Sequence, residues 1–186
     1  CWRSHVLAHR ALSFQVVVST NLKRNSNVSI RKDVRASPYG PQRYFEDFKV
    51  GETFYIPSRT VTDAHFSAFQ AASGDNHPIH YDRPFCLAHG HKDLLAHGYQ
   101  VAIQTAAGAG NFPFVVQDSL RAFIEQSTRF LAPVYSGDTL YPLLEVAELK
   151  PQRTTGVLTM RSTIHNQDDV LVLEGMQRYL IKKRGA

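Results

Sequence analysis

The chain has 186 residues, 43% of them hydrophobic and 20% charged, which is the composition of one ordinary globular domain rather than of a disordered or fibrous protein. Two cysteines, Cys1 and Cys86, are too few and too far apart for a disulfide framework and indicate a reducing compartment such as the cytoplasm. No apolar run approaches the roughly 18–20 residues of a membrane span, so we expect no membrane partner.

The net charge of +5 is unevenly distributed along the chain. Residues 1–43 hold eight Lys/Arg and one acid, whereas residues 44–186 hold thirteen Lys/Arg and fifteen Asp/Glu. The longer part therefore has no basic surface that favours a nucleic-acid partner. We interpret residues 1–43 as a disordered basic leader or extension and residues 44–184 as the folded domain. An upstream extension is the favoured interpretation, and a mitochondrial transit peptide, which has this Arg-rich, acid-poor composition, is the alternative.

The first half of the domain reads as one strand followed by helices. Residues 53–61 alternate loosely and predict a strand. Thr62 is a good N-cap for a helix that runs to about Ala72, and residues 84–88 predict a short helical turn. Residues 98–110, GYQVAIQTAAGAG, contain small and apolar residues without a charge, so we expect one continuous helix that is enclosed by the rest of the fold.

The second half of the domain shows the two-residue period of strands. Turn residues separate four such runs, at 119–131, 139–149, 155–165 and 170–182. Pro142 lies inside the second run and predicts an edge position or a bulge there. The pattern indicates an α+β fold, in which an antiparallel sheet wraps around one helix of small residues. Strands of such a sheet leave edges, and we expect a homodimer to cover them.

The loop between the two predicted helices concentrates chemical groups. Gly74 ends the first helix, and Pro78 restricts the backbone, so that Asp75 and His80 lie on a stiff bend. A carboxylate and an imidazole at this spacing can converge on one water molecule, and histidine suits proton transfer in both directions because its ordinary pKa is about 6.5.

Gly98 supplies the second half of the candidate site, because it begins a helix soon after that loop. A backbone N–H at a helix N-terminus has no partner within the helix and can hold a developing oxyanion. A base, an acid and an oxyanion donor together suit the addition or removal of water next to a thioester carbonyl.

Other interpretations compete with this one. Asp75 can be a turn former, His80 a structural hydrogen-bonding residue, and Gly98 a packing residue. Six of the nine histidines lie between His65 and His97, which raises a metal site, with the pairs 77/80 and 89/91 as ligands. We expect no metal, because Cys86 is the only sulfur nearby, and nothing marks that thiol as a nucleophile. His89, His91 and His97 more simply cap loops or line the cleft.

Three blocks of sequence resemble a known family. Residues 73–82, SGDNHPIHYD, resemble the signature G-D-x-N-P-[LIV]-H of MaoC-like, (R)-specific enoyl-CoA hydratases. Residues 95–98, LAHG, resemble the step into that family's central helix, and residues 130–139, FLAPVYSGDT, resemble its F-x-x-P-V-x-x-G-D block. The blocks keep the family's order and cover roughly residues 44–183, and the combination is specific.

The resemblance implies a single hotdog fold, usually dimeric, and an acyl-CoA substrate. It implies reversible syn addition of water to a trans-2-enoyl-CoA, with Asp75 and His80 as the catalytic pair and Gly98 as the oxyanion donor. No cofactor is implied beyond CoA as the handle of the substrate. The signature's Asn corresponds to His77, with Asn76 one place earlier, so that His77 either braces the loop or reaches the acyl pocket.

We expect four residues near the catalytic group to bind substrate: Asn76, His77, His97 and Tyr99. Two alternatives to a hydratase remain open. An acyl-CoA thioesterase of the same fold generally has a carboxylate on the central helix, and residues 98–110 contain none. A non-catalytic acyl-CoA-binding subunit is the other alternative, against which the retained Asp75 and His80 argue.

Overall fold

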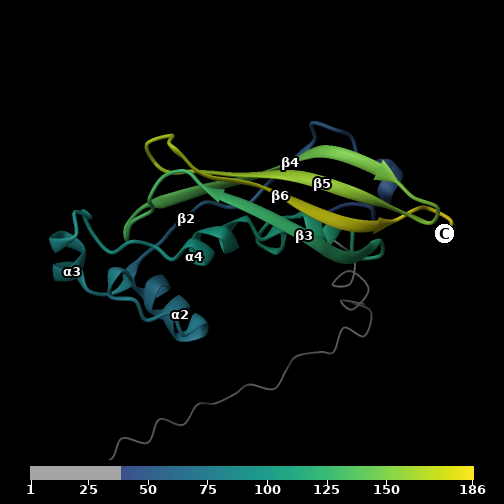
Figure 1. Ribbon diagram of the computed structural model, residues 1–186. Coiled ribbons are helices and arrows are strands. Elements are labelled where there is room, and N and C mark those ends of the chain that lie inside the picture. Colours follow the sequence, from purple (N-terminus) through teal and green to yellow (C-terminus); the bar gives the residue numbers. More distant parts are fainter. Residues whose placement is uncertain (1–38) are drawn as a thin grey trace, which may run out of the picture. The chain divides into compact units, whose positions relative to one another are not determined.

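The structure is a computed structural model that describes residues 39–186, shown in Figure 1. The predicted leader therefore lies almost entirely outside the described residues. Its last residues contact the domain ahead of the predicted start at residue 44: Tyr39 stacks on Phe114 at 4.7 Å, and the Arg43 amide donates to the Val115 carbonyl at 2.7 Å. No helix among residues 39–186 has the length and hydropathy that a membrane crossing needs.

The fold is built on an antiparallel sheet in which the strand order is β1-β4-β5-β6-β3, with β2 also paired to β4. Figure 1 shows the long strands side by side. The bounds are β1 Thr53–Tyr55, β2 Arg59–Thr60, β3 Leu120–Phe130, β4 Thr139–Pro151, β5 Thr155–His165 and β6 Leu171–Lys182. All four runs predicted in the second half are thus confirmed as strands with closely matching ends.

The first predicted strand, residues 53–61, is wrong in its continuity. Pro57 separates β1 from β2, because proline lacks the N–H that a continuous strand pair would use. The expectation for Pro142 holds only locally: β4 as a whole pairs with β5 on one side and with β1 and β2 on the other, and its register shift lies between Val146 and Glu148, but neither β1 nor β2 pairs with Pro142 itself. Pro142 falls where pairing with β1 has ended and pairing with β2 has not begun.

Helices and short 3-10 turns occupy the segments between β2 and β3, with one further turn ahead of β1. The bounds are α2 Asp63–Ser73, α3 Arg83–Ala88, α4 Gly98–Ala102, α5 Phe112–Val115, η1 Phe45–Asp47, η2 Pro78–His80, η3 Ile103–Thr105 and η4 Ala107–Ala109. Thr62 is the N-cap of α2 as predicted, and Gly74 ends that helix in the left-handed region at φ 72°, where glycine is favoured.

The predicted continuous helix over residues 98–110 is wrong, because the chain leaves helical geometry at Ala106, where ψ is 117°. Two glycines follow, and each costs a helix about 1 kcal/mol relative to alanine. Gly110 also has a positional reason: a Cβ there would lie 2.6 Å from the Tyr55 carbonyl oxygen, so only glycine allows this close approach to β1.

The central helix, formed by α4 and the turn η3 that continues it, is enclosed on one face only. Val101 and Ala102 are buried against the sheet, at 4% and 7% exposure, whereas Tyr99 is 81% exposed and Ile103 is 53% exposed. The expectation of a fully enclosed helix is therefore wrong for a single chain. The outer face of the helix remains available to another surface.

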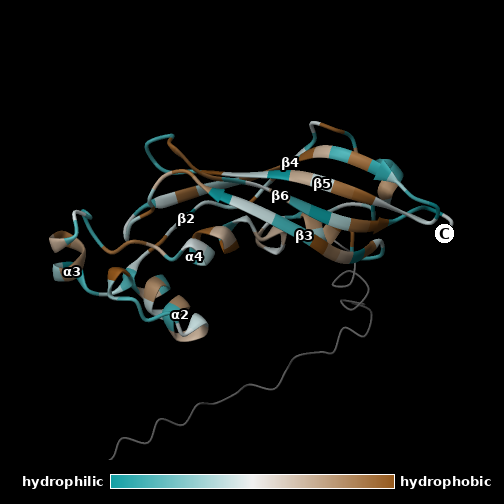
Figure 2. Cartoon of the chain, viewed as in Figure 1, coloured by the Kyte–Doolittle hydropathy of each residue, from teal (hydrophilic) through white to brown (hydrophobic). Residues whose placement is uncertain are grey.

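The core has two parts, and both pack against the sheet. One lies around Phe112, whose ring contacts those of Phe54 and Tyr179 at 5.2 and 5.1 Å. The other packs α2 and α4 against the ends of β4–β6 and includes Phe66 and Cys86. Hydrophobic and hydrophilic residues alternate along the strands, as Figure 2 shows, so one face of the sheet is packed and the other is more polar.

Truncating a core leucine should destabilise the domain far more than truncating an exposed one. Leu158 on β5 is 0% exposed and Leu87 on α3 is 62% exposed. Leu158→Ala should lower the free energy of unfolding by about 2–5 kcal/mol, because the cavity cannot fully collapse, while Leu87→Ala should change it by less than about 0.5 kcal/mol. Urea denaturation measures both values, and equal losses would contradict the assignment of the core.

Candidate active site

The loop after α2 is held in shape by its own hydrogen bonds. The His77 amide donates to Asp75 Oδ1 at 3.3 Å, and the Ile79 amide donates to His77 Nδ1 at 3.3 Å, so that His77 is the N-cap of η2. Pro78 is the first residue of that turn, a position where a missing N–H costs nothing. The stiffness predicted for this bend therefore has a clear structural basis.

A second set of contacts ties η2 to the body of the domain. The Ile79 carbonyl accepts hydrogen bonds from the Leu95 amide at 3.0 Å and from the Cys86 thiol at 3.0 Å. Cys86 is 0% exposed. Its thiol is thus occupied in packing and in holding the turn, which argues against the nucleophile interpretation.

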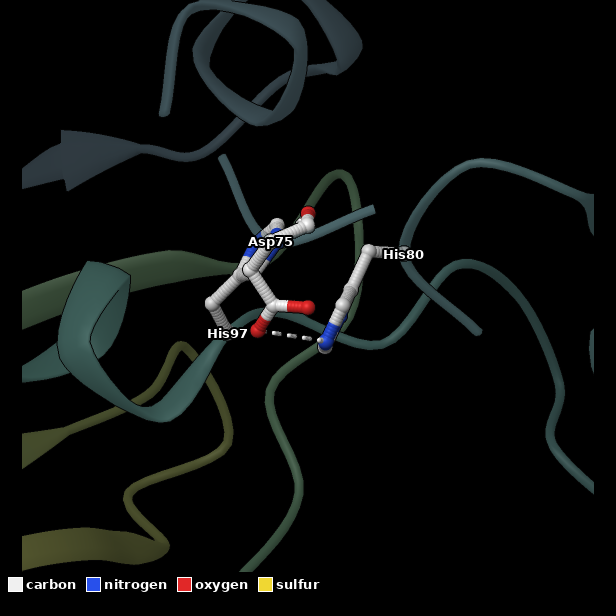
Figure 3. A group of neighbouring side chains, drawn as sticks. All are labelled: Asp75, His80 and His97. Carbon is white, nitrogen blue, oxygen red and sulfur yellow. Dashed lines mark hydrogen bonds and ion pairs between the residues drawn. The ribbon is translucent and has the colours of Figure 1, made fainter. Parts of the chain in front are cut away.

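Asp75 and His80 face each other, as Figure 3 shows, with His80 Nε2 3.9 Å from Asp75 Oδ2. His80 Nδ1 lies 2.6 Å from the Leu95 carbonyl oxygen, which can only accept, so Nδ1 carries the proton. The Nε2 lone pair is therefore directed at the Asp75 carboxylate across a gap too long for a direct hydrogen bond. One water molecule can bridge these two acceptors by donating to both.

The His80 imidazole is held in its neutral form. Burial lowers its pKa below 6.5, because removing water disfavours the charged ring, and the neighbouring His97 acts in the same direction. The hydrogen bond to Leu95 and the charge of Asp75 oppose this effect without overcoming it. Near neutral pH His80 is thus available as a proton acceptor.

His97 lies directly against this pair. It is the N-cap of α4, is 3% exposed, and its ring stacks on that of His80 with centroids 3.6 Å apart and planes inclined by 20°. Its Nε2 lies 3.1 Å from the Asp75 carbonyl oxygen. The sequence motifs at residues 73–82 and 95–98 thus meet through this side chain.

Gly98 is the first residue of α4, and its N–H donates to no acceptor within residues 39–186. The ring of Phe130, at the end of β3, occupies the space next to it: a Cβ at position 98 would lie 3.1 Å from that ring. A side chain at position 98 would therefore have to displace this ring, and Gly98 itself lines the pocket.

A pocket of about 1120 Å³ begins at this group and extends along the inner side of β3. Such a volume accommodates a large organic ligand. Its walls are mainly apolar and aromatic. The large side chains that line it include Phe69, Ile103, Phe112, Phe123, Phe130 and Tyr179. At the end where the pocket begins it is lined by Asp75, His97, Gly98 and Tyr99.

The remaining predicted site residues lie off the pocket wall. His80 lies behind Asp75 and His97, which it contacts, and it does not line the pocket itself. His77 and Asn76 hold the loop: the Ile79 amide donates to His77 Nδ1, and Asn76 Oδ1 accepts from Gln70 Nε2 at 2.7 Å. His89 and His91 contact Phe85 and Tyr135 away from the pocket.

The sequence did not indicate Phe130 as a neighbour of the site, although Phe130 begins one of the quoted motifs. It also missed Gln100, which is 2% exposed and whose Oε1 lies 3.2 Å from His97 Nδ1. The signal for Gln100 is a polar side chain among small apolar residues.

The group does not suit a metal ion. Ligand atoms of Asp75, His80 and His97 lie within 4.8 Å of one another, which is close enough to raise the question. The two imidazole rings are nearly parallel, however, so their nitrogen lone pairs run side by side instead of converging on one point. His80 Nδ1 and His97 Nε2 also each already face a backbone carbonyl.

Comparison with known proteins shows the family to which the chain belongs. The profile of the MaoC like domain matches residues 47–167. The chain belongs to the MaoC-like family of dehydratases and hydratases.

Individual relatives agree with this membership. The MaoC-like chain is 30% identical over 141 residues to a 3-hydroxybutyryl-CoA dehydratase of Methylorubrum extorquens, covering 76% of this chain and 85% of that one. It is 28% identical over 142 residues to an (R)-specific enoyl-CoA hydratase of Rhodospirillum rubrum, covering 76% and 94%. A Mycobacterium tuberculosis protein with a double hotdog fold superposes with a TM-score of 0.65 at 28% identity, covering 77% of this chain and 45% of that one. The predicted hotdog fold, an antiparallel sheet around a central helix, is confirmed.

The lowered pKa of His80 should make the stability of the protein depend on pH, which can be tested without substrate. In the folded protein His80 should take up its second proton, the one that makes the ring a cation, only below pH 6.5. In the unfolded chain the same protonation occurs near pH 6.5. The unfolded state then gains more protons as the pH falls, so the free energy of unfolding should decrease from pH 6.5 down to the folded pKa. Urea denaturation at pH 7.5 and 5.5 measures this, and His80→Gln should lose less stability over that interval. Identical pH dependence in both proteins would contradict the lowered pKa.

Proposed function

We propose that this MaoC-like protein adds water to trans-2-enoyl-CoA to form (R)-3-hydroxyacyl-CoA, or catalyses the reverse dehydration. The observation that carries the proposal is the 3.9 Å gap between Asp75 Oδ2 and the unprotonated Nε2 of His80. This gap suits one water molecule, and Asp75 lines the same apolar pocket as Gly98, whose N–H donates to no acceptor among the described residues.

The proposed reaction proceeds by proton transfer on one face of the substrate. The bridging water donates hydrogen bonds to Asp75 and His80, and His80 Nε2 takes its proton as the oxygen attacks C3 of the enoyl group. The electrons of the double bond move toward the thioester oxygen, where the Gly98 N–H stabilises the developing charge, an effect typically worth about 3–4 kcal/mol. The proton then passes from the Asp75/His80 pair to C2, which restores the starting protonation states.

This chemistry implies syn addition, because water and proton come from the same pair of side chains. Dehydration follows the same steps in reverse. The steps are proton transfers and the formation of one C–O bond, without net oxidation or reduction, so the proposal needs no cofactor beyond CoA as part of the substrate. The (R) configuration of the product is supported by the likeness to the (R)-specific enoyl-CoA hydratase of Rhodospirillum rubrum.

The pocket supports an acyl chain as the part of the substrate that is buried. Its walls near the catalytic end are formed by Phe69, Tyr99 and Ile103, which offer apolar contact but no charge. Tyr99, 81% exposed and on the pocket wall, retains its proposed role in substrate binding. For Asn76 and His77 the loop hydrogen bonds favour a role in bracing Asp75 over direct contact with substrate.

We also propose that the working unit is a homodimer. β3 is the last strand in the sheet order, and it exposes Phe123, Ile124 and Phe130 at 52%, 49% and 53%. Tyr99 and Ile103 expose apolar surface on the neighbouring helix. An open strand edge beside exposed apolar side chains is the kind of surface that a second copy covers. Phe123 and Ile103 also line the pocket, so a partner there would close the substrate site.

Removing either member of the catalytic pair should abolish most of the activity. With crotonyl-CoA as substrate, Asp75→Asn and His80→Gln should each lower kcat by at least about 10²-fold, because the water loses its orienting group or its base. The readout is loss of enoyl-thioester absorbance without release of free thiol. His89→Gln, the same substitution at a histidine outside the pocket, is the control and should retain activity. Near-normal turnover in either catalytic variant would contradict the assignment.

The same assay separates the alternative functions. Release of free CoA by the unmodified protein would indicate a thioesterase, although residues 98–110 contain no carboxylate for that reaction. Binding of the thioester without any turnover would indicate an accessory acyl-CoA-binding subunit. A panel of straight, branched and dicarboxylic enoyl-CoAs then identifies the preferred acyl group.

Side chains at position 98 should impair the reaction through the ring of Phe130. Gly98→Val should lower kcat by about 10²-fold, comparable with the loss of an oxyanion donor. Gly98→Ala should have a smaller effect, because the partly exposed ring can move, and Phe130→Leu in the same protein should restore part of that loss. Steady-state kinetics of the single and double variants measure the coupling, and strictly additive losses would separate Phe130 from the oxyanion site.

A further inference from the structure

His97 has contacts that its role as a cleft-lining residue does not explain. Its Nε2 faces the carbonyl oxygen of Asp75 at 3.1 Å, and its Nδ1 faces Oε1 of Gln100 at 3.2 Å. Both partners are oxygen atoms that only accept, whereas a neutral imidazole has a single N–H to donate. A neutral His97 can therefore donate to only one of these two oxygens. The other contact needs an arrangement in which the partner atom donates a proton to the ring nitrogen.

Gln100 supplies that arrangement. It is 2% exposed, and its side-chain nitrogen has no hydrogen-bond partner within the described part of the chain. Oxygen and nitrogen of a glutamine amide differ only by a half-turn of the group. With the amide turned, its nitrogen donates to His97 Nδ1, and His97 Nε2–H donates to the Asp75 carbonyl. The unpaired position then holds an oxygen, and an under-satisfied buried carbonyl is more common than an orphaned buried N–H.

A doubly protonated His97 would also satisfy both oxygens, but its surroundings disfavour it. The ring is 3% exposed and lies against His80 at 3.6 Å, so a cation there would be stripped of water and placed beside a second imidazole. Phe69 from α2 lies against the His97 ring at a centroid distance of 4.9 Å and offers no counter-charge. The only carboxylate in the group, that of Asp75, points toward His80.

From these contacts we propose that His97 and Gln100 are positioning residues, and that His97 is neutral with its proton on Nε2. In this arrangement Gln100 sets the tautomer of His97. His97 then holds the Asp75 backbone through its N–H and sets the plane of His80 through the stack. Together these contacts maintain the 3.9 Å gap between Asp75 and His80 in which the water would lie.

The catalytic consequence rests on the proposed function, but the tautomer does not. ¹⁵N-histidine NMR of the unmodified protein at pH 7.5 tests the tautomer directly, with His97 and His80 signals assigned from the variants His97→Gln and His80→Gln. The expected result is a proton on Nε2 of His97 and on Nδ1 of His80. A doubly protonated His97, or one with its proton on Nδ1, would overturn the proposal even if the protein is an active hydratase.

Variants of Gln100 test the positioning role. Gln100→Glu places an acceptor-only carboxylate at Nδ1 and should convert His97 to the doubly protonated form in the NMR spectrum. Gln100→Leu removes the amide and should lower kcat about 10-fold for crotonyl-CoA, with KM nearly unchanged, because only the geometry of Asp75 and His80 suffers. Thermal denaturation establishes that the variants are folded at the assay temperature.

Two complementary substitutions divide the functions of His97. His97→Gln retains a donor near the position of Nε2 but loses the ring, and His97→Phe retains a ring on His80 but loses the donor. Each should lower kcat more than it changes KM, and the fall should exceed that of Gln100→Leu. A rise in KM with unchanged kcat would make His97 a substrate contact and overturn the positioning role. Lack of turnover in every protein, with the expected tautomers present, would instead contradict the proposed function alone.

Discussion

The hydrogen bonds between the turn η2 and the segment that precedes α4 are the constraint on which the site depends. Ile79 and Leu95 are joined through backbone atoms, and the His80 ring donates to the Leu95 carbonyl. These bonds orient the imidazole and leave Nε2 unprotonated on the side of Asp75. Without them the carboxylate and the imidazole would lie on a surface loop with no fixed relation to Gly98.

Burial then determines what these groups can do. His80 is removed from water far enough that its pKa falls, so the neutral base is the resting form. His97 is buried more deeply and packs on the same ring. Two adjacent cations would cost much to bury at this position. The chemistry that suits this environment moves one proton at a time, as the addition and removal of water require.

The sheet contributes both rigidity and an unfinished surface. The long strands β4, β5 and β6 bury the core that supports the central helix, while β3 remains an edge with exposed aromatic side chains. The pocket runs along that same edge. The proposed substrate pocket and the proposed dimer surface therefore share apolar residues along β3, which gives the proposed dimer a direct bearing on the proposed activity.

The sequence by itself determined the parts of the fold that rest on local patterns. The two-residue period of residues 119–182 predicted the four long strands, because alternation records which side chains face the core. Thr62 and Gly74 marked the ends of α2, since capping depends on neighbouring residues only. The motifs at residues 73–82 and 95–98 indicated Asp75, His80 and Gly98, because these short stretches resemble the signature of the family.

Only the tertiary structure decided how those residues meet. The position of Pro142 within β4 depends on which strands lie alongside, as does the close approach of Gly110 to Tyr55. The stack of His97 on His80 and the contact of Phe130 with Gly98 join residues far apart in the chain. Such contacts leave no periodic pattern in a sequence, because they follow from packing between elements rather than from the propensity of any one of them.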